Sequence, residues 1–264
     1  MIQDDVIVVG AHSAGTYSNQ GKVYVYRYDG VSWNEEAILS ASDFGGNNFF
    51  GSSVALDGDH LAVGATGHMH NGIRSGSAYV FSYDGTSWIQ QTELTPFDAA
   101  TDDEFGDSVA IQDDTLVVGA NREETINPGA VYIYNWDGDS WEYTTQLVSA
   151  AGPAYDAFGS AVSLSGSWLA VGAYADSERG SSSGTVNLFS WNGVTWHEEV
   201  EFTSTDVTAG STSDRFGCSV GVSGNYLLAG AIQAEGNITI GRAGAAYMYD
   251  LSTVTITSAE DIDT

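Results

Sequence analysis

Hydrophobic and polar residues alternate in short runs along most of the chain, and turn residues separate the runs. One cycle of this pattern predicts four strands: FGSSVALDG (residues 50–58), HLAVGA (60–65), SAYVFSYDG (77–85) and TSWIQQTEL (86–94). Aromatic residues occupy every second position of the third run, at Tyr79, Phe81 and Tyr83, which indicates packing against a neighbouring sheet. No long segment has apolar residues at helical spacing, so we expect an all-β protein.

The four-strand pattern repeats, and three sequence markers keep the same period. Gly-Ala recurs at Gly10, Gly64, Gly119, Gly172 and Gly230, with spacings of 54, 55, 53 and 58 residues. Phe-Gly begins at Phe50, Phe105, Phe158 and Phe216, and a tryptophan recurs at Trp33, Trp88, Trp141 and Trp196. Repeats of four antiparallel strands are typical of propeller blades. We therefore predict one β-propeller domain over residues 1–264, with repeats at approximately 1–49, 50–104, 105–157, 158–215 and 216–264. A fragment of a seven-bladed propeller is the alternative.

An antiparallel path sorts the connections between strands into two faces. Tight turns join the first strand of a repeat to the second and the third to the fourth, where Asp-Gly and Asn-Gly sequences favour hairpins. Longer loops join the second strand to the third, and links lead from the fourth strand to the next repeat. Because loops on a rigid scaffold commonly carry binding residues, we expect a protein or a glycan to bind on this long-loop face. The aromatic residues predicted to contact it are Tyr17, Phe44, Tyr155 and Tyr174.

The charge of the chain narrows the classes of partner. Asp and Glu number 35 against 7 Lys and Arg, which gives a net charge of −28. Such a surface repels nucleic acid and anionic lipid, and no apolar run approaches the roughly 20 residues that a membrane span requires. We therefore expect neither nucleic-acid binding nor membrane insertion. Cys218 is the only cysteine, so the chain forms no internal disulfide bond.

The Phe-Gly opening and the Gly-Ala ending resemble the FG-GAP repeat, the blade unit of integrin α-chain propellers and of many secreted microbial proteins. The sequence is most similar to the microbial and algal pattern, which is seen here in Asp103-Glu104-Phe105-Gly106, Gly119-Ala120, Asp137-Gly138 and Trp141. The resemblance implies an extracellular or cell-surface propeller that binds proteins, mediates adhesion or assembles a surface structure. It does not imply an enzyme. A lectin-like carbohydrate-binding propeller is the alternative.

Acidic residues in the links have two interpretations. Integrin blades that bind calcium carry alternating Asp residues between their first two strands, where this chain has only tight turns such as Asp57-Gly58-Asp59. We therefore do not expect integrin-type calcium binding, because Ca²⁺ takes about 6–8 oxygen ligands and these tight turns offer too few. The link acids either form weak Ca²⁺ sites with backbone carbonyls or accept backbone N–H groups and fix the links. They are Asp43, Asp98, Asp103, Asp156, Asp206 and Asp214.

Three smaller motifs carry weaker hypotheses. His68 and His70 lie on one side of an extended segment and offer half of a transition-metal site, but we expect an exposed polar loop. The stretch around Ser13 imitates the G-x-S-x-G nucleophile of hydrolases without its strand–turn–helix context, so a hydrolase is the least favoured function. Asn237 opens a glycosylation sequon in Asn237-Ile238-Thr239.

The two ends of the sequence predict incomplete repeats. When Gly10 is aligned with Gly119, Met1 falls on Ala110, so the first repeat lacks most of its first strand. After Tyr249 the Asp-Gly turn and the tryptophan are missing, and the segment from Thr253 is the candidate for a last strand. Five blades that close imperfectly, a larger propeller that has been cut, and a strand donated by another chain all fit this pattern. An unpaired strand edge favours such a donation.

Overall fold

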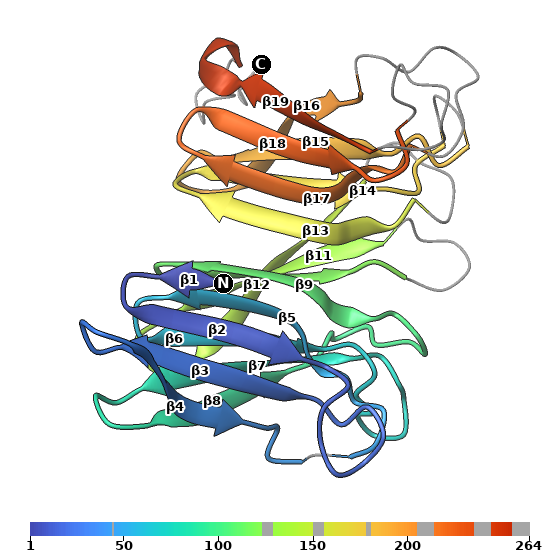
Figure 1. Ribbon diagram of the computed structural model, residues 1–264. Coiled ribbons are helices and arrows are strands. Elements are labelled where there is room, and N and C mark those ends of the chain that lie inside the picture. The colour runs from blue at the N-terminus through green and yellow to red at the C-terminus, as the bar shows by residue number, and fades with distance from the viewer. Residues whose placement is uncertain are drawn as a thin grey trace. The chain divides into compact units, whose positions relative to one another are not determined.

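The computed structural model describes residues 1–43, 45–122, 129–149, 156–177, 181–204, 214–234 and 244–254. Within these ranges it is an all-β protein built from five antiparallel sheets, a β-propeller-like repeat fold (Figure 1). The chain divides into two compact units: unit 1 is Met1–Glu124 with Val131–Leu147, and unit 2 is Thr125–Ala130 with Val148–Thr264. The predicted fold class is thereby confirmed.

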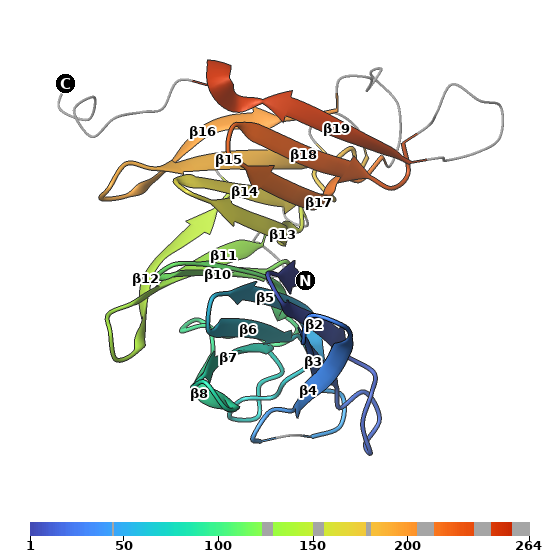
Figure 2. The ribbon, with the colours of Figure 1, turned by 60° about the vertical axis from the view of Figure 1, so that its left-hand side comes forward.

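Each sheet, here called a blade, follows the chain from its first strand to its last, as the sheet β5–β8 shows in Figure 2. Blade 1 contains β1 (Ile2–Gln3), β2 (Val6–Ala11), β3 (Lys22–Tyr28) and β4 (Trp33–Leu39). Blade 2 contains β5 (Phe50–Asp57), β6 (His60–Ala65), β7 (Ser77–Tyr83) and β8 (Trp88–Leu94). Blade 3 contains β9 (Phe105–Gln112), β10 (Thr115–Ala120), β11 (Ala130–Trp136) and β12 (Trp141–Val148).

Unit 2 continues the same order of strands. Blade 4 contains β13 (Phe158–Ser165), β14 (Trp168–Ala173), β15 (Thr185–Trp191) and β16 (Trp196–Phe202). Blade 5 contains β17 (Phe216–Ser223), β18 (Tyr226–Ala231) and β19 (Ala245–Asp250), followed by the short 3-10 helix η1 (Leu251–Thr253). The segment that we considered for a last strand lies largely outside the described residues. At the other end β1 is two residues long and pairs with β2, as the shortened first repeat predicts.

A β-bulge opens the first strand of the blades that begin with Phe-Gly. In β5, Phe50 pairs with Ala65, but the next paired residues are Val54 and Val63, so the register shifts. The residue before the phenylalanine has a left-handed backbone, with φ of 54° at Phe49. Gly51, which follows, has φ of 85°, a conformation that favours glycine. The same left-handed backbone recurs at Glu104, Ala157 and Arg215.

Motif glycines of successive blades touch each other inside each unit. A Cβ atom on Gly64, at the end of β6, would overlap the carbonyl oxygen of Gly106 at the start of β9. Glycine is required here because two backbones approach more closely than any side chain permits. Gly-Ala and Phe-Gly are therefore two halves of one contact between blades. The pairs are Gly10 with Gly51, Gly64 with Gly106 and, in unit 2, Gly172 with Gly217.

The alternating strands bury their apolar faces between successive blades. In unit 1, Val8 and Val25 of blade 1 belong to one buried cluster with Phe50, Tyr79 and Phe81 of blade 2. The ring of Phe50 packs edge-on against Tyr79 at 5.5 Å between centroids. In blade 2, the aromatic residues of the third strand thus pack between blades, as their spacing predicts. A second cluster joins blades 4 and 5 in unit 2.

Side chains close the Asp-Gly hairpins. In the turn between β3 and β4, Asp29 Oδ1 accepts the backbone N–H groups of Val31 and Ser32, both at 2.8 Å. These turns therefore span four residues rather than the two of the tightest hairpins. The bonds from backbone N–H groups lower the pKa of Asp29, and those of Asp84 and Asp137 in the equivalent turns.

Asp107 in β9 makes the stability of unit 1 depend on pH. Burial, with a smaller contribution from the charge of Glu104, raises the pKa of Asp107 to about 6 from its ordinary 3.8. The folded chain therefore holds a proton that the unfolded chain has lost, so stability falls as pH rises from about 4 through 6. Asn121 Nδ2 donates to Asp107 Oδ2 at 2.6 Å, while the buried Asn121 Oδ1 has no hydrogen-bond partner among the described residues.

We expect Asp107→Asn to stabilise unit 1 by about 2 kcal/mol at pH 7 and to change little at pH 4. The amide removes the ionisation and offers a donor to Asn121 Oδ1. Thermal unfolding of both proteins between pH 4 and 7 measures the difference. Asp139→Asn, on an exposed turn, removes a charge without the burial and serves as the control. If the transition temperatures of Asp107→Asn and the unaltered chain differ by the same amount at every pH in this range, the prediction is wrong.

Candidate functional site

The long-loop face of unit 1 is held together by backbone hydrogen bonds between links and loops. The N–H of Asn47, in the link from blade 1 to blade 2, donates to Ser18 O at 2.7 Å in the loop between β2 and β3. The N–H of Asp102, in the next link, donates to Arg74 O at 2.6 Å, and Arg74 Nη1 pairs with Asp102 Oδ1 at 2.8 Å. In Figure 1 the connections that follow β2 and β4 lie at the right of unit 1, and the β3–β4 turn lies at the left. Each link is therefore hydrogen-bonded to a neighbouring loop, and together they form one continuous surface.

A cavity of about 390 Å³ lies on this surface, between the link before β5 and the loop that joins β6 to β7. Its lining combines two asparagine amides, an aromatic ring, a thioether and a guanidinium group, which is a mixed apolar and polar character typical of ligand sites. The lining residues are Gly46, Asn47, Asn48, Phe49, Gly67, Met69 and Arg74.

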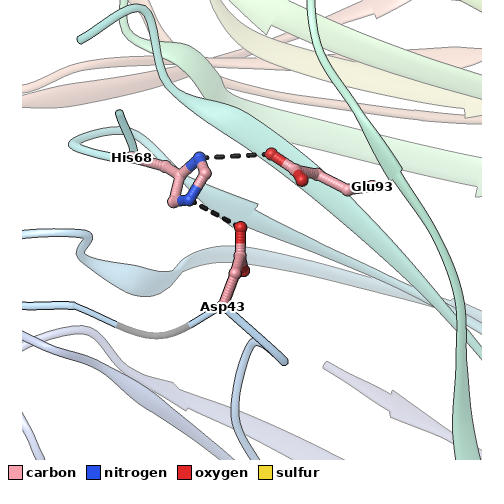
Figure 3. Close-up of side chains that lie close together, drawn as sticks. All are labelled: Asp43, His68 and Glu93. Carbon is pink, nitrogen blue, oxygen red and sulfur yellow. Dashed lines mark ion pairs between the residues drawn. The ribbon is translucent and has the colours of Figure 1, made fainter. Parts of the chain in front are cut away.

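Beside the cavity, three side chains converge from separate elements (Figure 3). His68 comes from the β6–β7 loop, Asp43 from the link before β5 and Glu93 from β8. His68 Nε2 lies 2.9 Å from Asp43 Oδ2, and His68 Nδ1 lies 3.2 Å from Glu93 Oε1. The side chain of His68 is 6% exposed, that of Glu93 22% and that of Asp43 42%. A buried imidazole therefore lies between two carboxylates that remain open to solvent.

Further hydrogen bonds hold the two carboxylates. Ser77 Oγ donates to Glu93 Oε1 at 2.7 Å and lies 2.8 Å from His68 Nδ1. Tyr79 OH donates to Asp43 Oδ1 at 2.9 Å, and its ring meets the imidazole edge-on at 5.9 Å between centroids. Each partner comes from β7, so this strand fixes both sides of the cluster.

The charges in the cluster favour a protonated His68. Burial lowers the pKa of His68, but the hydrogen bond to Glu93 and the charges of Asp43 and Glu93 outweigh it, so the pKa is raised above the ordinary 6.5. Burial raises the pKa of Glu93, but the hydrogen bonds from His68 and Ser77 outweigh it and lower the pKa. Burial raises the pKa of Tyr79, so its hydroxyl stays a donor. The cluster is an ion-paired clamp that ties a loop, a link and a strand together.

The backbone places His68 at the base of its loop. Its N–H donates to Ala65 O at 3.0 Å, and its carbonyl oxygen accepts the N–H of Gly76 at 3.1 Å. Ala14, Asp176 and Ala234 make the same pair of bonds in blades 1, 4 and 5. This loop base is therefore common to blades 1, 2, 4 and 5, and among these the histidine side chain is particular to blade 2.

The expectation of an exposed loop at the two histidines is wrong for His68. Its ring is buried because Asp43 and Glu93, which are distant in sequence, approach it from either side. His70 is 45% exposed, and its Nδ1 lies 3.9 Å from Glu93 Oε1. Alternation in the sequence places both imidazoles on one side of the segment, but it does not show which other elements cover them.

The predicted calcium residues occupy two kinds of place. Asp43 and Asp98 accept the hydroxyl groups of Tyr79 and Tyr132, the latter at 2.7 Å. Three others, each two residues before Phe-Gly, are buried; Asp103 Oδ2 accepts the N–H of Ala100 at 2.6 Å. Among the described residues, only Asp43 of this set belongs to a group of three metal-ligating side chains. The other buried acids are Asp156 and Asp214, and Asp206 lies outside the described residues.

The predicted ligand-binding aromatics are only partly described. Tyr17 is 56% exposed in the β2–β3 loop, and Tyr174 is half-buried with the Arg215 guanidinium 5.7 Å from its ring centre. Ser13 is exposed in an irregular loop between β2 and β3, without the helix that a nucleophile elbow needs. Phe44, Tyr155 and the sequon residue Asn237 lie outside the described residues.

Sequence reasoning missed Glu93, Ser77 and Tyr79 as members of the cluster. One sequence feature could have pointed to Glu93: it is an acid in the outer strand β8. In the structure it contacts both histidines of the β6–β7 loop. Period-two alternation alone assigned these residues to strands and left their partners undefined.

The model of the FG-GAP repeat family matches four segments of the chain, at residues 33–81, 88–134, 141–189 and 196–249. Each match begins at the tryptophan of a fourth strand and ends in the third strand of the following blade. It therefore includes a link, a Phe-Gly bulge and a Gly-Ala strand, which are the parts that join two blades. Asp43 and His68 lie in the first match and Glu93 in the second.

Proposed function

Because the chain belongs to the FG-GAP repeat family, we propose that it is a non-catalytic module of the cell surface or the extracellular space that binds a protein partner. FG-GAP repeats are generally non-enzymatic and typically form protein-binding or adhesion propellers. Within the described ranges, no helix has the length and apolar character needed to cross a membrane. The proposed binding surface is the long-loop face of unit 1.

The observation that carries this proposal is the supported cavity on that face. Links and loops are joined by backbone hydrogen bonds, so little conformational entropy is lost when a partner binds. Exposed apolar side chains lie on the loops of this face: Met69, which lines the cavity, is 57% exposed, Tyr17 56% and Ile73 37%. Exposed methionine and aromatic side chains near a pocket are typical of protein interfaces. With a net charge of −28, the chain favours a neutral or basic partner surface.

We expect Met69→Asp to weaken partner binding at least about 10-fold, because the new carboxylate would lose its hydration when the partner covers it. The measurement is binding of the labelled full chain to intact cells of the organism that produces it, with cross-linking to identify the partner. Val31→Asp is the matched control, because Val31 is 88% exposed on the opposite, tight-turn face. Equal binding by both variants would place the interface elsewhere, and no binding by the unaltered chain would contradict the proposal.

A carbohydrate ligand is the second candidate, and the lining of the cavity supports it. Asn47 and Asn48 offer amides, Phe49 a ring and Arg74 a guanidinium group, and sugars are commonly bound by such a combination of hydrogen bonds and ring contact. A glycan array probed with the whole chain, with and without a chelator, tests this candidate. Binding that is lost in Arg74→Ala supports it, and an empty array under both conditions argues against it.

A further inference from the structure

Two exposed aromatic rings meet where the link from blade 2 to blade 3 passes the outer strand β12. Phe97 of the link is 69% exposed, and Tyr143 of β12 is 45% exposed. Their ring centroids lie 5.1 Å apart and their planes are inclined at 59°, so the rings are not stacked face to face. Large apolar side chains that gather at a surface, rather than standing singly, mark an interaction site.

Buried tyrosines of β11 position both rings. Tyr132, which is 1% exposed, meets Phe97 edge-on at 6.2 Å between ring centroids. Tyr134, which is 5% exposed, meets Tyr143 in the same way at 6.0 Å. Because the two exposed rings are held by buried ones, little side-chain entropy is lost when a ligand covers them.

An exposed carboxylate stands beside the rings. Asp98 follows Phe97 directly in the link, and its Oδ1 accepts the hydroxyl of Tyr132 at 2.7 Å. Its Oδ2 accepts Gln146 Nε2 at 3.2 Å, so the carboxylate is fixed in place. Burial raises the pKa of Tyr143 and the charge of Asp98 raises it further, which shows that the field of this carboxylate reaches the ring. No basic side chain of the described residues forms an ion pair with Asp98.

The equivalent place between blades 1 and 2 is polar. Ser42 lies three residues after the end of β4, as Phe97 lies three residues after the end of β8. Gln90 is the third residue of β8, as Tyr143 is the third residue of β12. Ser42 N donates to Gln90 Oε1 at 3.0 Å, and Gln90 Nε2 donates to Ser42 Oγ at 3.1 Å. The scaffold therefore forms this junction without aromatic rings, so folding alone does not explain the pair.

Another part of unit 1 shows how a ring and a carboxylate hold a cation. The guanidinium group of Arg27 lies over the ring of Tyr83, 4.8 Å from its centre, and pairs with Glu36. Glu36 Oε1 accepts Trp88 Nε1 at 2.9 Å and Arg27 Nη2 at 3.3 Å. A carboxylate oxygen that already accepts one donor thus accepts a guanidinium group as well. The oxygens of Asp98 have the same capacity, because each carries two lone pairs.

We propose that Phe97, Tyr143 and Asp98 bind an arginine side chain of the protein partner. The planar guanidinium group packs on the exposed ring surface and donates to the carboxylate, a combination that suits arginine better than lysine. The inference rests on the proposed function, since it names the chemistry of one contact with that partner. The net charge of −28 attracts a basic surface to the chain.

Titration of the isotope-labelled full chain with N-acetylarginine amide, followed by NMR, tests the site. We expect saturable shifts at the backbone amides of Asp98 and Gln146, and binding about five-fold weaker or less for the neutral isostere N-acetylcitrulline amide. The double variant Phe97→Ser with Tyr143→Gln installs the pair found between blades 1 and 2 and leaves the net charge unchanged. We expect it to weaken binding about five-fold or more. Tyr226→Ser, which removes a tyrosine that is 54% exposed in unit 2, is the control and keeps full affinity.

Three results would overturn the proposal. Equal affinity for the arginine and citrulline probes would show that the charge plays no part. Shifts that never saturate, disappear with added salt and persist in the double variant would show attraction to the acidic surface alone. Free L-arginine is the probe for a small-molecule ligand, and tighter binding than that of the capped form would contradict the assignment to a protein side chain. Because each probe is a single amino acid, a failure here leaves the cell-binding test of the proposed function untouched, and a failure there leaves this result untouched.

Discussion

Replacing His68 with leucine is expected to lower the free energy of unfolding by about 3 kcal/mol. The substitution keeps an apolar side chain in a place that is 6% exposed, but it leaves the carboxylates of Asp43 and Glu93 without the charge that lies between them. Breaking a fully buried pair costs about 3–5 kcal/mol, and the partial exposure of both acids places this case near the lower bound. Urea unfolding at neutral pH, followed by tryptophan fluorescence, measures the loss.

Two further variants test the cause of that loss. His70→Ala is expected to change stability by less than about 0.5 kcal/mol, because its side chain is exposed. The double variant His68→Leu with Glu93→Leu is expected to recover part of the stability, because the second change removes one unpaired carboxylate. If His68→Leu unfolds at the urea concentration of the unaltered chain, the cluster is not a clamp.

Gly172→Ala is expected to destabilise unit 2 by about 3 kcal/mol, at the upper end of the usual cost of overpacking. The added Cβ would overlap the carbonyl oxygen of Gly217 in the following blade. Backbone atoms cannot rotate away as a side chain does, so blades 4 and 5 must move apart. Calorimetry measures the effect as a lower transition temperature.

The matched control lies in the same unit. Gly221 in β17 has no positive φ, and a Cβ added there would meet no atom of the described residues within 4 Å. Gly221→Ala is therefore expected to be neutral or stabilising by up to about 1 kcal/mol. Equal losses in both variants would show that any strand glycine matters, and would remove the special role of the contact between Gly172 and Gly217.

The repeated fold was predictable because its signals are local. Alternation placed the strands, and Phe-Gly, Gly-Ala and tryptophan set their period. The reason for the two glycine motifs was not predictable, because Gly64 and Gly106 meet only after two sheets have formed and stacked. Hairpins were predicted at the Asp-Gly sequences, but not the four-residue turns in which Asp29 caps two N–H groups.

The candidate site was less accessible to sequence reasoning. His68 and His70 were recognised as a pair of imidazoles, and Asp43 as a link acid, but nothing in the sequence joined them. Their meeting depends on the link and the outer strand β8 both passing the β6–β7 loop. Such a meeting is a property of tertiary structure, and composition predicts only that acids are abundant.

The glycine contact between blades also bears on how such a chain grows by gene duplication. Because the contact is made by backbone atoms, a copied blade carries both halves of the junction, whatever its other side chains are. A newly inserted repeat therefore brings the backbone part of both junctions with it, and only the apolar side chains between the blades have to be matched. The loops can then differ from blade to blade, and the place of His68 in blade 2 is taken by Ala14 in blade 1 and Ala234 in blade 5.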